Sequence, residues 1–242
     1  MDTGIYVALS KEIGILRDME VTANDLANQT TTGYNGENLL FKDFLVSNGT
    51  KEGKVSYAND IATYRDTSQG ALTTTGSPLD AAIQGKGYFV VETPLGIRYT
   101  RNGNFKINNN GVLVNADGYT VMDDSNQEIT FDDADKVITI RDDGTVNVDG
   151  AGRGTLKVAQ FDNEQLLQHV GNNMYKSDVA PKLYSDNYTI VNGMLEGSNV
   201  QPVLKLTHMM YVSRSITDTV NYITTVDALT RKASDTLAKV YS

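Results

Sequence analysis

The stretch from residue 201 to residue 242, QPVLKLTHMMYVSRSITDTVNYITTVDALTRKASDTLAKVYS, decides how the rest of the chain is organised. Apolar residues recur along it at steps of three and four, which is the period of an α-helix with one apolar face. Pro202 suits the first helical turn, where its missing N–H costs nothing. A helix of roughly 38 residues would be about 57 Å long. That is longer than a globular core requires, which points to contacts outside one domain.

A second helix is predicted at the other end of the chain, from about residue 3 to residue 28, with Glu12 as the polar exception on its apolar face. It is expected to end at Asn28–Gly33, because β-branched residues and glycine disfavour helix. The apolar positions of the two helices are predicted to form a subunit interface. They are Ile5, Leu9, Ile13, Leu16, Met19, Ala23 and Leu26 in the first helix, and Leu206, Met209, Val212, Ile216, Val220, Ile223 and Leu237 in the second.

The C-terminal helix is rich in threonine, a mediocre helix former because its branched Cβ loses rotamer freedom. A helix of this kind with one apolar stripe is marginal alone. The N-terminal helix would cover about half of that stripe, so the remainder requires neighbours from other chains. We therefore predict that both ends are poorly ordered in the monomer and fold on assembly. The pattern alone also fits an internal antiparallel hairpin or a dimer seam.

Between the helices, from about residue 35 to residue 195, the apolar period changes to two. Hairpin turns are predicted at Asn102-Gly103, Asn110-Gly111, Asp117-Gly118 and Asp143-Gly144, since these pairs tolerate positive φ angles. Many short strands with close turns indicate an antiparallel sandwich or an irregular barrel. A short helix is expected near residues 162–169. The tyrosines of this region are assigned to the core and rim of the strands.

The predicted fold class is therefore α+β, with two parts. A discontinuous, coiled-coil-like helical domain is made from the N- and C-terminal helices, and an irregular all-β domain, sandwich- or barrel-like, lies in the middle. The predicted boundaries are 1–34 and 200–242 for the helical assembly domain, 35–68 and 187–199 for connecting extended segments, and 69–186 for the β domain.

Composition excludes several classes of function. The net charge is −9 and the basic residues are scattered, which argues against nucleic acid as a partner. There is no cysteine, so disulfides and thiolate sites are absent. The N-terminus lacks the pattern of a cleavable signal peptide, and no run of residues reaches the length of a membrane helix. The chain is therefore expected not to be embedded in a membrane.

No catalytic, cofactor-binding or metal site is predicted, and the chain is not expected to be an enzyme. His169 and His208 are too isolated to hold a metal, and no phosphate loop or nucleophile elbow occurs. The aspartate pairs Asp123/Asp124, Asp132/Asp133 and Asp142/Asp143 are interpreted as solvated turns, because calcium-loop spacing and a sugar-stacking Trp are missing. A β-rich carbohydrate-binding or carbohydrate-hydrolysing protein that uses one of these pairs remains the alternative from another class, beside an adhesin that shares only the architecture.

Three motifs extend over nearly the whole chain: ANDLANQTTTGY at 23–34, GALTTTGSPLD, AIQGKGYF and YTRNGNF between 70 and 105, and LEGSNVQPV at 195–203. In order and spacing they resemble the motifs of bacterial flagellar basal-body rod and hook proteins. The residues that carry the resemblance are Asn24, Leu26, Ala27, Asn28, Thr31, Thr32, Gly33, Tyr34, Gly85, Gly87, Glu196, Ser198, Asn199 and Val200. Two positions depart from the family pattern: Asp25 replaces the usual second Asn of the first motif, and Lys205 stands where Glu is usual.

The resemblance implies a structural subunit of the flagellar basal-body rod, which polymerises through its terminal helices into the shaft that carries torque from motor to hook. Within the family the chain looks most like the proximal-rod proteins, with the distal-rod proteins as the alternative. The implied partners are further copies of the chain, other rod proteins and the flagellar export apparatus, without cofactor or small-molecule substrate. The implied location is the basal body across the periplasm, reached without a cleaved signal. If the usual Glu contacts a neighbouring subunit, a change that compensates for Lys205 is expected in that partner.

Overall fold

The computed structural model describes residues 2–47, 54–132, 137–182 and 188–240, and it describes their side chains except for those of 2–7, 41–61, 237, 238 and 240. The chain forms two compact units. Unit 1 comprises residues 1–27, 37–65 and 201–242, and unit 2 comprises residues 28–36 and 66–200.

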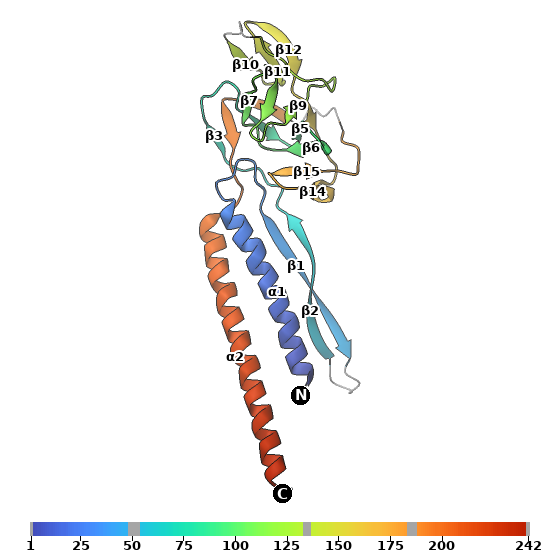
Figure 1. The fold of residues 1–242 in the computed structure, drawn as a ribbon, viewed down its shortest axis with the longest axis vertical. Helices are drawn as coiled ribbons and strands as arrows, with labels where there is room; N and C mark the ends of the chain where they lie inside the picture. Colours follow the sequence, from blue (N-terminus) through green and yellow to red (C-terminus); the bar gives the residue numbers. More distant parts are fainter. Residues whose placement is uncertain (1, 48–53, 133–136, 183–187, 241–242) are drawn as a thin grey trace. The chain divides into compact units, whose positions relative to one another are not determined.

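Unit 1 contains the two terminal helices and a β-hairpin (Figure 1). The helices are α1 (Asp2–Ala27) and α2 (Pro202–Val240), within a residue or two of the bounds that the sequence predicts. The antiparallel strands β1 (Glu37–Ser47) and β2 (Lys54–Arg65) form the hairpin, with a register shift between Leu40 and Phe41. α1 packs against both α2 and the hairpin.

The hairpin and the segment before it differ from the predicted organisation. Residues 35–68, expected to be connecting segments, are extended as predicted, but most of them pair with one another and pack on α1. The pairing satisfies the backbone groups that face the partner strand, and packing on α1 adds the tertiary contact that an isolated hairpin lacks. Residues 28–34, expected in the helical domain, belong to unit 2.

Unit 2 is almost entirely β-structure, built from short strands and one 3₁₀ helix. They are β3 (Leu72–Thr74), β4 (Ala81–Gly85), β5 (Tyr88–Thr93), β6 (Gly96–Thr100), β7 (Phe105–Ile107), β8 (Leu113–Asn115), β9 (Thr120–Val121), β10 (Ile138–Ile140), β11 (Thr145–Val148), β12 (Ala151–Thr155), β13 (Val158–Ala159), η1 (Glu164–Leu166), β14 (Gln168–His169), β15 (Met174–Lys176), β16 (Tyr188–Asn192) and β17 (Met194–Glu196). The 3₁₀ helix lies within the segment where a short helix is expected. The α+β class with a mostly β middle is confirmed.

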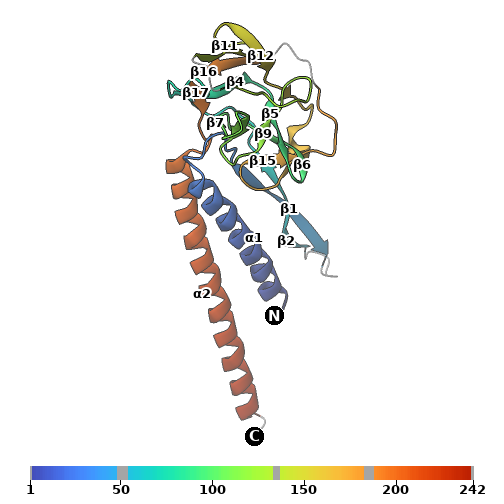
Figure 2. The same ribbon diagram turned by 45° about the horizontal axis from the view of Figure 1, so that its top comes forward.

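The largest sheet of unit 2 has the strand order β14-β15-β6-β5-β9-β8-β7, with β13 paired to β5. Smaller sheets pair β10-β11-β12, β16 with β4, and β17 with β3. The turned view in Figure 2 shows β4, β16 and β17 close together. Because no pairing joins the outer strands β14 and β7, the described strands of the largest sheet form no closed barrel, and the barrel alternative is wrong for them.

The core of unit 2 lies on both faces of β5. Phe89 and Val91 belong to one buried cluster and Tyr88 and Val90 to another, as the alternation of side chains along a strand requires. Tyr88 is in T-shaped contact with Tyr175, at 5.7 Å between ring centroids. The assignment of tyrosines to the strand core is confirmed for this second cluster.

Two of the predicted turns show how glycine acts in different ways. Gly144 has a φ of +86° in the turn between β10 and β11, as the Asp-Gly pair predicts. The Asn102-Gly103 pair does not close a hairpin, since β6 pairs with β5 and β15 whereas β7 pairs with β8. Gly103 is required for close approach instead, because a Cβ there would lie 1.7 Å from the carbonyl oxygen of Ala81.

Candidate assembly site and its supporting joints

A buried ion pair ties the third sequence motif to the second inside unit 2. The Glu196 side chain is 1% exposed, and its Oε2 lies 3.6 Å from Nε of Arg101. Its Oε1 accepts a hydrogen bond from the backbone N–H of Gly70 at 3.1 Å. Arg101 also donates from Nη2 to the carbonyl of Gly85 at 2.8 Å, and its guanidinium lies 5.5 Å from the ring centroid of Tyr88. Burial raises the pKa of Glu196, while Arg101 and the Gly70 N–H oppose that shift.

Asn199 joins three segments of unit 2. Its Nδ2 donates to the carbonyls of Asp66 at 2.8 Å and Ser68 at 3.0 Å, and its Oδ1 accepts from the N–H of Gly36 at 2.8 Å. Its own backbone N–H donates to the carbonyl of Tyr34 at 3.3 Å. Asn199 therefore connects the segment after β17 to the two earlier segments at residues 34–36 and 66–68.

The third motif runs close to the first motif at Gly33 and to the second motif at Gly70. Gly33, with φ of +66°, donates to the carbonyl of Glu196 at 2.7 Å, and a Cβ on it would lie 2.7 Å from backbone atoms of Arg101. A Cβ on Gly70 would lie only 2.0 Å from the carbonyl oxygen of Gly197. The motif glycines are therefore fixed by backbone conformation and by lack of space.

Asn173 was not identified from the sequence. It sits in the turn between β14 and β15 with φ of +55°, and its Nδ2 donates to the carbonyl of Thr32 at 2.6 Å. The only sequence signal was the neighbouring Gly171-Asn172, which resembles many other turns in this chain.

In unit 1 a polar clasp holds α1, β1 and α2 together. The Asp25 side chain is 0% exposed, and its Oδ2 lies 2.7 Å from Nζ of Lys205. Its Oδ1 accepts from the N–H of Glu37 at 3.0 Å, while Nζ of Lys205 donates to the carbonyl of Glu37 at 3.2 Å. Asp25 and Lys205 are the two departures from the family pattern. Lys205 therefore has a counter-ion, Asp25, within the same chain, and the change expected in a neighbouring subunit stays a prediction.

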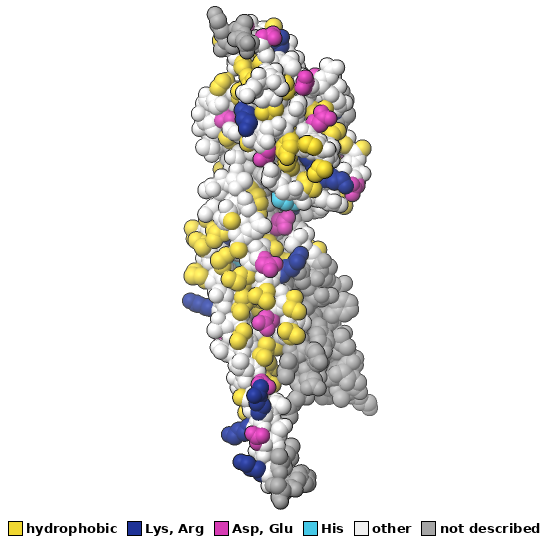
Figure 3. Space-filling model, in the orientation of Figure 1, with side chains coloured by type: hydrophobic (Ala, Val, Ile, Leu, Met, Phe, Trp, Pro, Cys, Tyr) yellow, Lys and Arg dark blue, Asp and Glu magenta, His cyan; other side chains and the backbone are white. Residues whose placement is uncertain are grey.

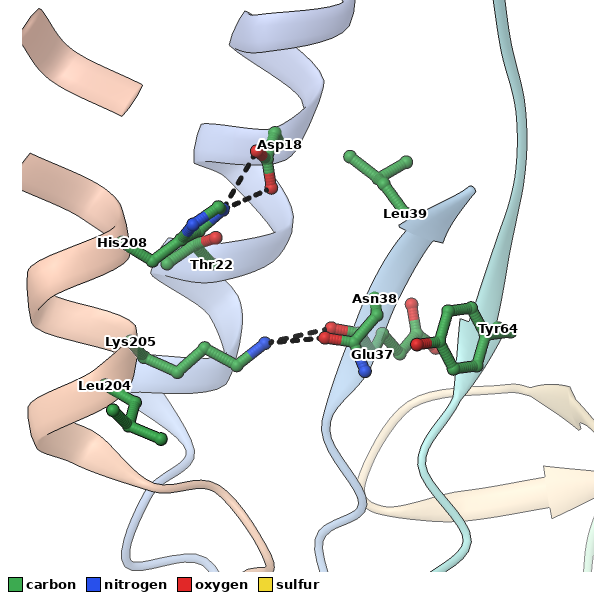
Figure 4. A pocket seen from close by; sticks show the side chains of 9 residues that line it. All are labelled: Asp18, Thr22, Glu37, Asn38, Leu39, Tyr64, Leu204, Lys205 and His208. Atoms are coloured by element: carbon green, nitrogen blue, oxygen red, sulfur yellow. Dashed lines mark hydrogen bonds and ion pairs between the residues drawn. The ribbon is translucent and has the colours of Figure 1, made fainter. Parts of the chain in front are cut away.

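A pocket of about 440 Å³ opens beside this clasp, lined by residues of α1, α2, β1 and β2 (Figure 4). His208 contacts Asp18 across it, with Nε2 at 2.9 and 3.0 Å from the two carboxylate oxygens. Lys205 reaches from α2 toward Glu37 and Asn38. Within the described ranges, no cluster of three His, Cys, Asp or Glu side chains could hold a metal ion. No helix in those ranges is both long enough and apolar enough to cross a membrane.

Comparison of the sequence with known proteins gives matches to flagellar proteins. The family model described as the flagellar hook protein FlgE/F/G D1 domain matches residues 82–148, and that of the flagellar basal body rod FlgEFG protein C-terminal region matches residues 191–236. The flagellar basal-body rod protein FlgF of Caulobacter vibrioides is 33% identical over 99% of this chain and 100% of the relative. The chain belongs to the flagellar basal-body rod protein family.

Further rod proteins show the same breadth of similarity. The FlgF protein of Mesorhizobium japonicum is 32% identical over 90% of this chain and 91% of the relative. The FlgG protein of Bacillus subtilis is 30% identical over 93% of this chain and 95% of the relative. The predicted resemblance to the flagellar rod proteins is confirmed, since the FlgF relatives match over nearly the whole chain, and the FlgG matches are compatible with the alternative rod position.

The predicted interface residues of this rod-family chain whose side chains are described fall into three groups by exposure. Leu9, Ile13, Leu16, Ala23, Leu206 and Val220 are exposed, Met19, Leu26, Met209, Ile216 and Ile223 are half-buried, and Val212 is buried. The side chains of Ile5 and Leu237 lie outside the described residues. The buried face of α1 is formed instead by Ala8, Gly14, Thr22 and Asp25, which carry no large apolar side chain. Leu9, Ile13 and Leu16 of α1 therefore face solvent in the single rod-family chain.

Two of the paired aspartates accept hydrogen bonds in turns, whereas Asp132 forms an ion pair with Arg153 at 2.8 Å. Asp123 Oδ1 accepts from the N–H of Gln127 at 2.7 Å, and Asp143 Oδ1 from that of Thr145 at 2.9 Å. The Thr145 N–H lowers the pKa of Asp143, as expected for a carboxylate that caps a turn. The interpretation as turns is confirmed for these two residues, whereas Asp133 lies outside the described residues.

Proposed function

We propose that this chain is a structural subunit of the bacterial flagellar basal-body rod and that it polymerises through α1 and α2. The observation that carries the proposal is the exposure of large apolar side chains along both helices. They include Leu9, Ile13 and Leu16 of α1 and Leu206, Met210, Tyr211, Val220, Tyr222 and Leu229 of α2. Figure 3 shows hydrophobic side chains gathered along the helices of unit 1 on one face of the molecule.

The exposed rows make assembly favourable. Full burial of a Leu, Ile or Val side chain contributes about 1.5–3 kcal/mol, so a second chain that covers these rows gains substantially from each residue. Monomeric soluble proteins rarely leave so many large apolar residues exposed along one element. The proposed role requires no catalytic residue, and this proposal assigns none.

Finer parts of the proposal rest on the family. The pairing of α1 with α2 is coiled-coil-like, and the helical assembly domain includes the β1–β2 hairpin. The subunit occupies the proximal rod, spans the periplasm with other rod proteins and transmits torque. It is delivered by the flagellar export apparatus without a cleaved signal. A distal-rod position is the second candidate, favoured by the relatives named FlgG.

The test is concentration-dependent assembly of the full chain, followed by analytical ultracentrifugation and electron microscopy. Wild-type protein is expected to form rod-like polymers, and Ile13→Glu is expected to prevent this by placing a charge in the apolar row of α1. Leu95→Glu is the matched control, because Leu95 is an exposed apolar residue of unit 2, 84% exposed. The proposal fails if wild type stays monomeric at every concentration, or if both variants assemble equally.

A further inference from the structure

A second pocket of unit 1, of about 390 Å³, is lined by methionines of both α1 and α2, which pack against each other. Its other lining residues all come from α2 and follow one another at helical spacing, so they belong to one side of that helix. Met19, Met209 and Met210 form a methionine cluster at this pocket. The complete lining is Met19, Leu206, Met209, Met210, Ser213 and Arg214.

The methionine cluster is more accessible than the methionines in the core of unit 2. Met210 is 57% exposed, and Met19 and Met209 are half-buried. Met122 and Met174 are each 6% exposed and belong to the two buried clusters of unit 2. Because the chain has no cysteine, its thioethers are its only sulfur groups. An oxidant in solution therefore reaches the sulfur atoms of the cluster before those of the core.

The reaction open to these thioethers is two-electron oxidation by hydrogen peroxide. A lone pair of the methionine sulfur attacks one peroxide oxygen, an S–O bond forms and the O–O bond breaks. The attacked oxygen gives its proton to the other oxygen, which leaves as water, so sulfur is oxidised and the peroxide is reduced. The product is methionine sulfoxide, a polar and chiral side chain that methionine sulfoxide reductases convert back to the thioether.

The pocket suits the two oxidation states differently. Its apolar wall, to which Leu206 contributes, fits a thioether, which is only a weak hydrogen-bond acceptor. A sulfoxide oxygen is a strong acceptor, and its burial in an apolar site costs free energy unless a donor reaches it. Ser213 and Arg214 line the same pocket, and both side chains carry donors. A sulfoxide is therefore drawn toward the polar part of the pocket and away from the apolar wall.

Oxidation at this pocket acts on the contact between the helices. Met19 and Met209 are half-buried on α1 and α2 respectively. A sulfoxide at either position has to leave the apolar contact or bury its oxygen there, and both outcomes weaken the packing of α1 on α2. The clasp of Asp25 and Lys205 is a separate contact without sulfur, so oxidation weakens the helix pair without removing its ion pair.

We infer that the methionine cluster, Met19–Met209–Met210, is an oxidation site at which hydrogen peroxide loosens the packing of α1 on α2. The site is independent of the proposed function, because it lies within one chain and requires no second copy. It gives a chain without cysteine a means of responding to an oxidant.

The first experiment treats the full-length chain with dilute hydrogen peroxide and follows oxygen uptake at each methionine by peptide mass spectrometry. Met210 is expected to react first, followed by Met209 and Met19, each roughly tenfold or more faster than the core methionines. Met122 and Met174 are internal controls, because they meet the same peroxide in the same sample. Equal rates for the cluster and the core would overturn the inference.

The second experiment measures urea unfolding by helical circular dichroism, which reports on unit 1 because both α-helices belong to it. Peroxide is expected to shift the wild-type midpoint to a lower urea concentration. A triple variant, Met19→Leu with Met209→Leu and Met210→Leu, keeps apolar side chains of similar size and is expected to show no shift. Met194→Leu, at a half-buried position of β17 in unit 2, is the matched control and should respond as wild type does. The inference is also overturned if oxidised wild type shows no shift, or if the triple variant shifts equally.

Discussion

Asp25 in the last turns of α1 and Lys205 in the first turn of α2 form an ion pair of 2.7 Å whose carboxylate is fully buried. The two residues are far apart in sequence, and each departs from the family pattern on its own. Together they supply the two opposite charges of one buried pair. Since Asp25 also binds the N–H of Glu37, the pair fixes the start of β1 against both helices.

We expect Asp25→Asn and Lys205→Glu to destabilise unit 1 singly and to compensate for each other in combination. The first leaves the Lys205 charge without its counter-ion, and the second sets two carboxylates against each other. Each is expected to cost about 3 kcal/mol of unfolding free energy, since breaking a buried pair leaves an uncompensated charge. Urea unfolding followed by helical circular dichroism measures this. Asp18→Asn is the control, because its partner His208 is 44% exposed and the contact is worth about 1 kcal/mol or less. A double variant no more stable than Lys205→Glu alone would contradict the account.

Glu196 predicts a pH dependence for unit 2. Burial raises its folded-state pKa above the ordinary value of 4.5, so ionisation costs more in the folded chain than in the unfolded one. The stability that this group contributes is therefore complete below pH 4.5 and is lost as the pH rises through the raised pKa.

Glu196→Gln removes that titration but keeps an acceptor for the Gly70 N–H. The stability of wild type relative to Glu196→Gln is expected to fall as the pH rises from acid toward neutral. Urea unfolding of both proteins at several pH values, followed by tyrosine fluorescence, measures the difference. A difference that stays constant with pH, or that increases, would rule out this role for Glu196.

Gly70→Ala tests the close approach of the second and third motifs within unit 2. The added Cβ would meet the carbonyl oxygen of Gly197 at 2.0 Å, so the backbone has to move. We expect a loss of about 3 kcal/mol or more, measured by thermal unfolding in the near-ultraviolet. Gly152→Ala is the matched control, because its Cβ would meet only side-chain atoms at 3.6 Å or beyond. Equal losses for the two variants would show that the contact is not tight.

Hydrogen exchange of the monomer is expected to show a gradient along α2. Its first half carries the clasp and the buried residues Val212 and Thr219, whereas residues 220–236 are exposed except for half-buried Ile223 and Val226. Amides beyond residue 220 should therefore exchange fastest and become protected on assembly. Uniform protection of α2 in the monomer would contradict folding on assembly.

Long, regular patterns were predictable from the sequence, and long-range polar pairing was not. The helices were found because apolar residues repeat over many turns, and their ends agree within a residue or two. The buried face of α1 was missed because Ala8, Gly14 and Thr22 leave no apolar signal. The hairpin of residues 37–65 was expected only as extended chain, since its stability depends on α1, which no local pattern reports.

The Asp25–Lys205 pair did leave a trace in the sequence. Two departures from the family pattern, one acidic and one basic, suggest a pair when they are considered together. Arg101 and Asn173 left weaker traces, because their partners are backbone carbonyls and a single buried carboxylate. Contacts of a side chain with a distant backbone carbonyl depend on the tertiary fold, so residue type alone does not predict them.

The bonds of Asn199 have a mechanical consequence. The chain crosses between the two units four times, and this one side chain and its own N–H bind backbone close to three of those crossings, at Tyr34 and Gly36, at Asp66 and Ser68, and at residue 199 itself. A force on any one of these three chain segments is therefore distributed to the other two through the hydrogen bonds of Asn199. The hydrogen bonds of Asn199 therefore couple these three segments mechanically, so that a force on one segment acts on all of these bonds together.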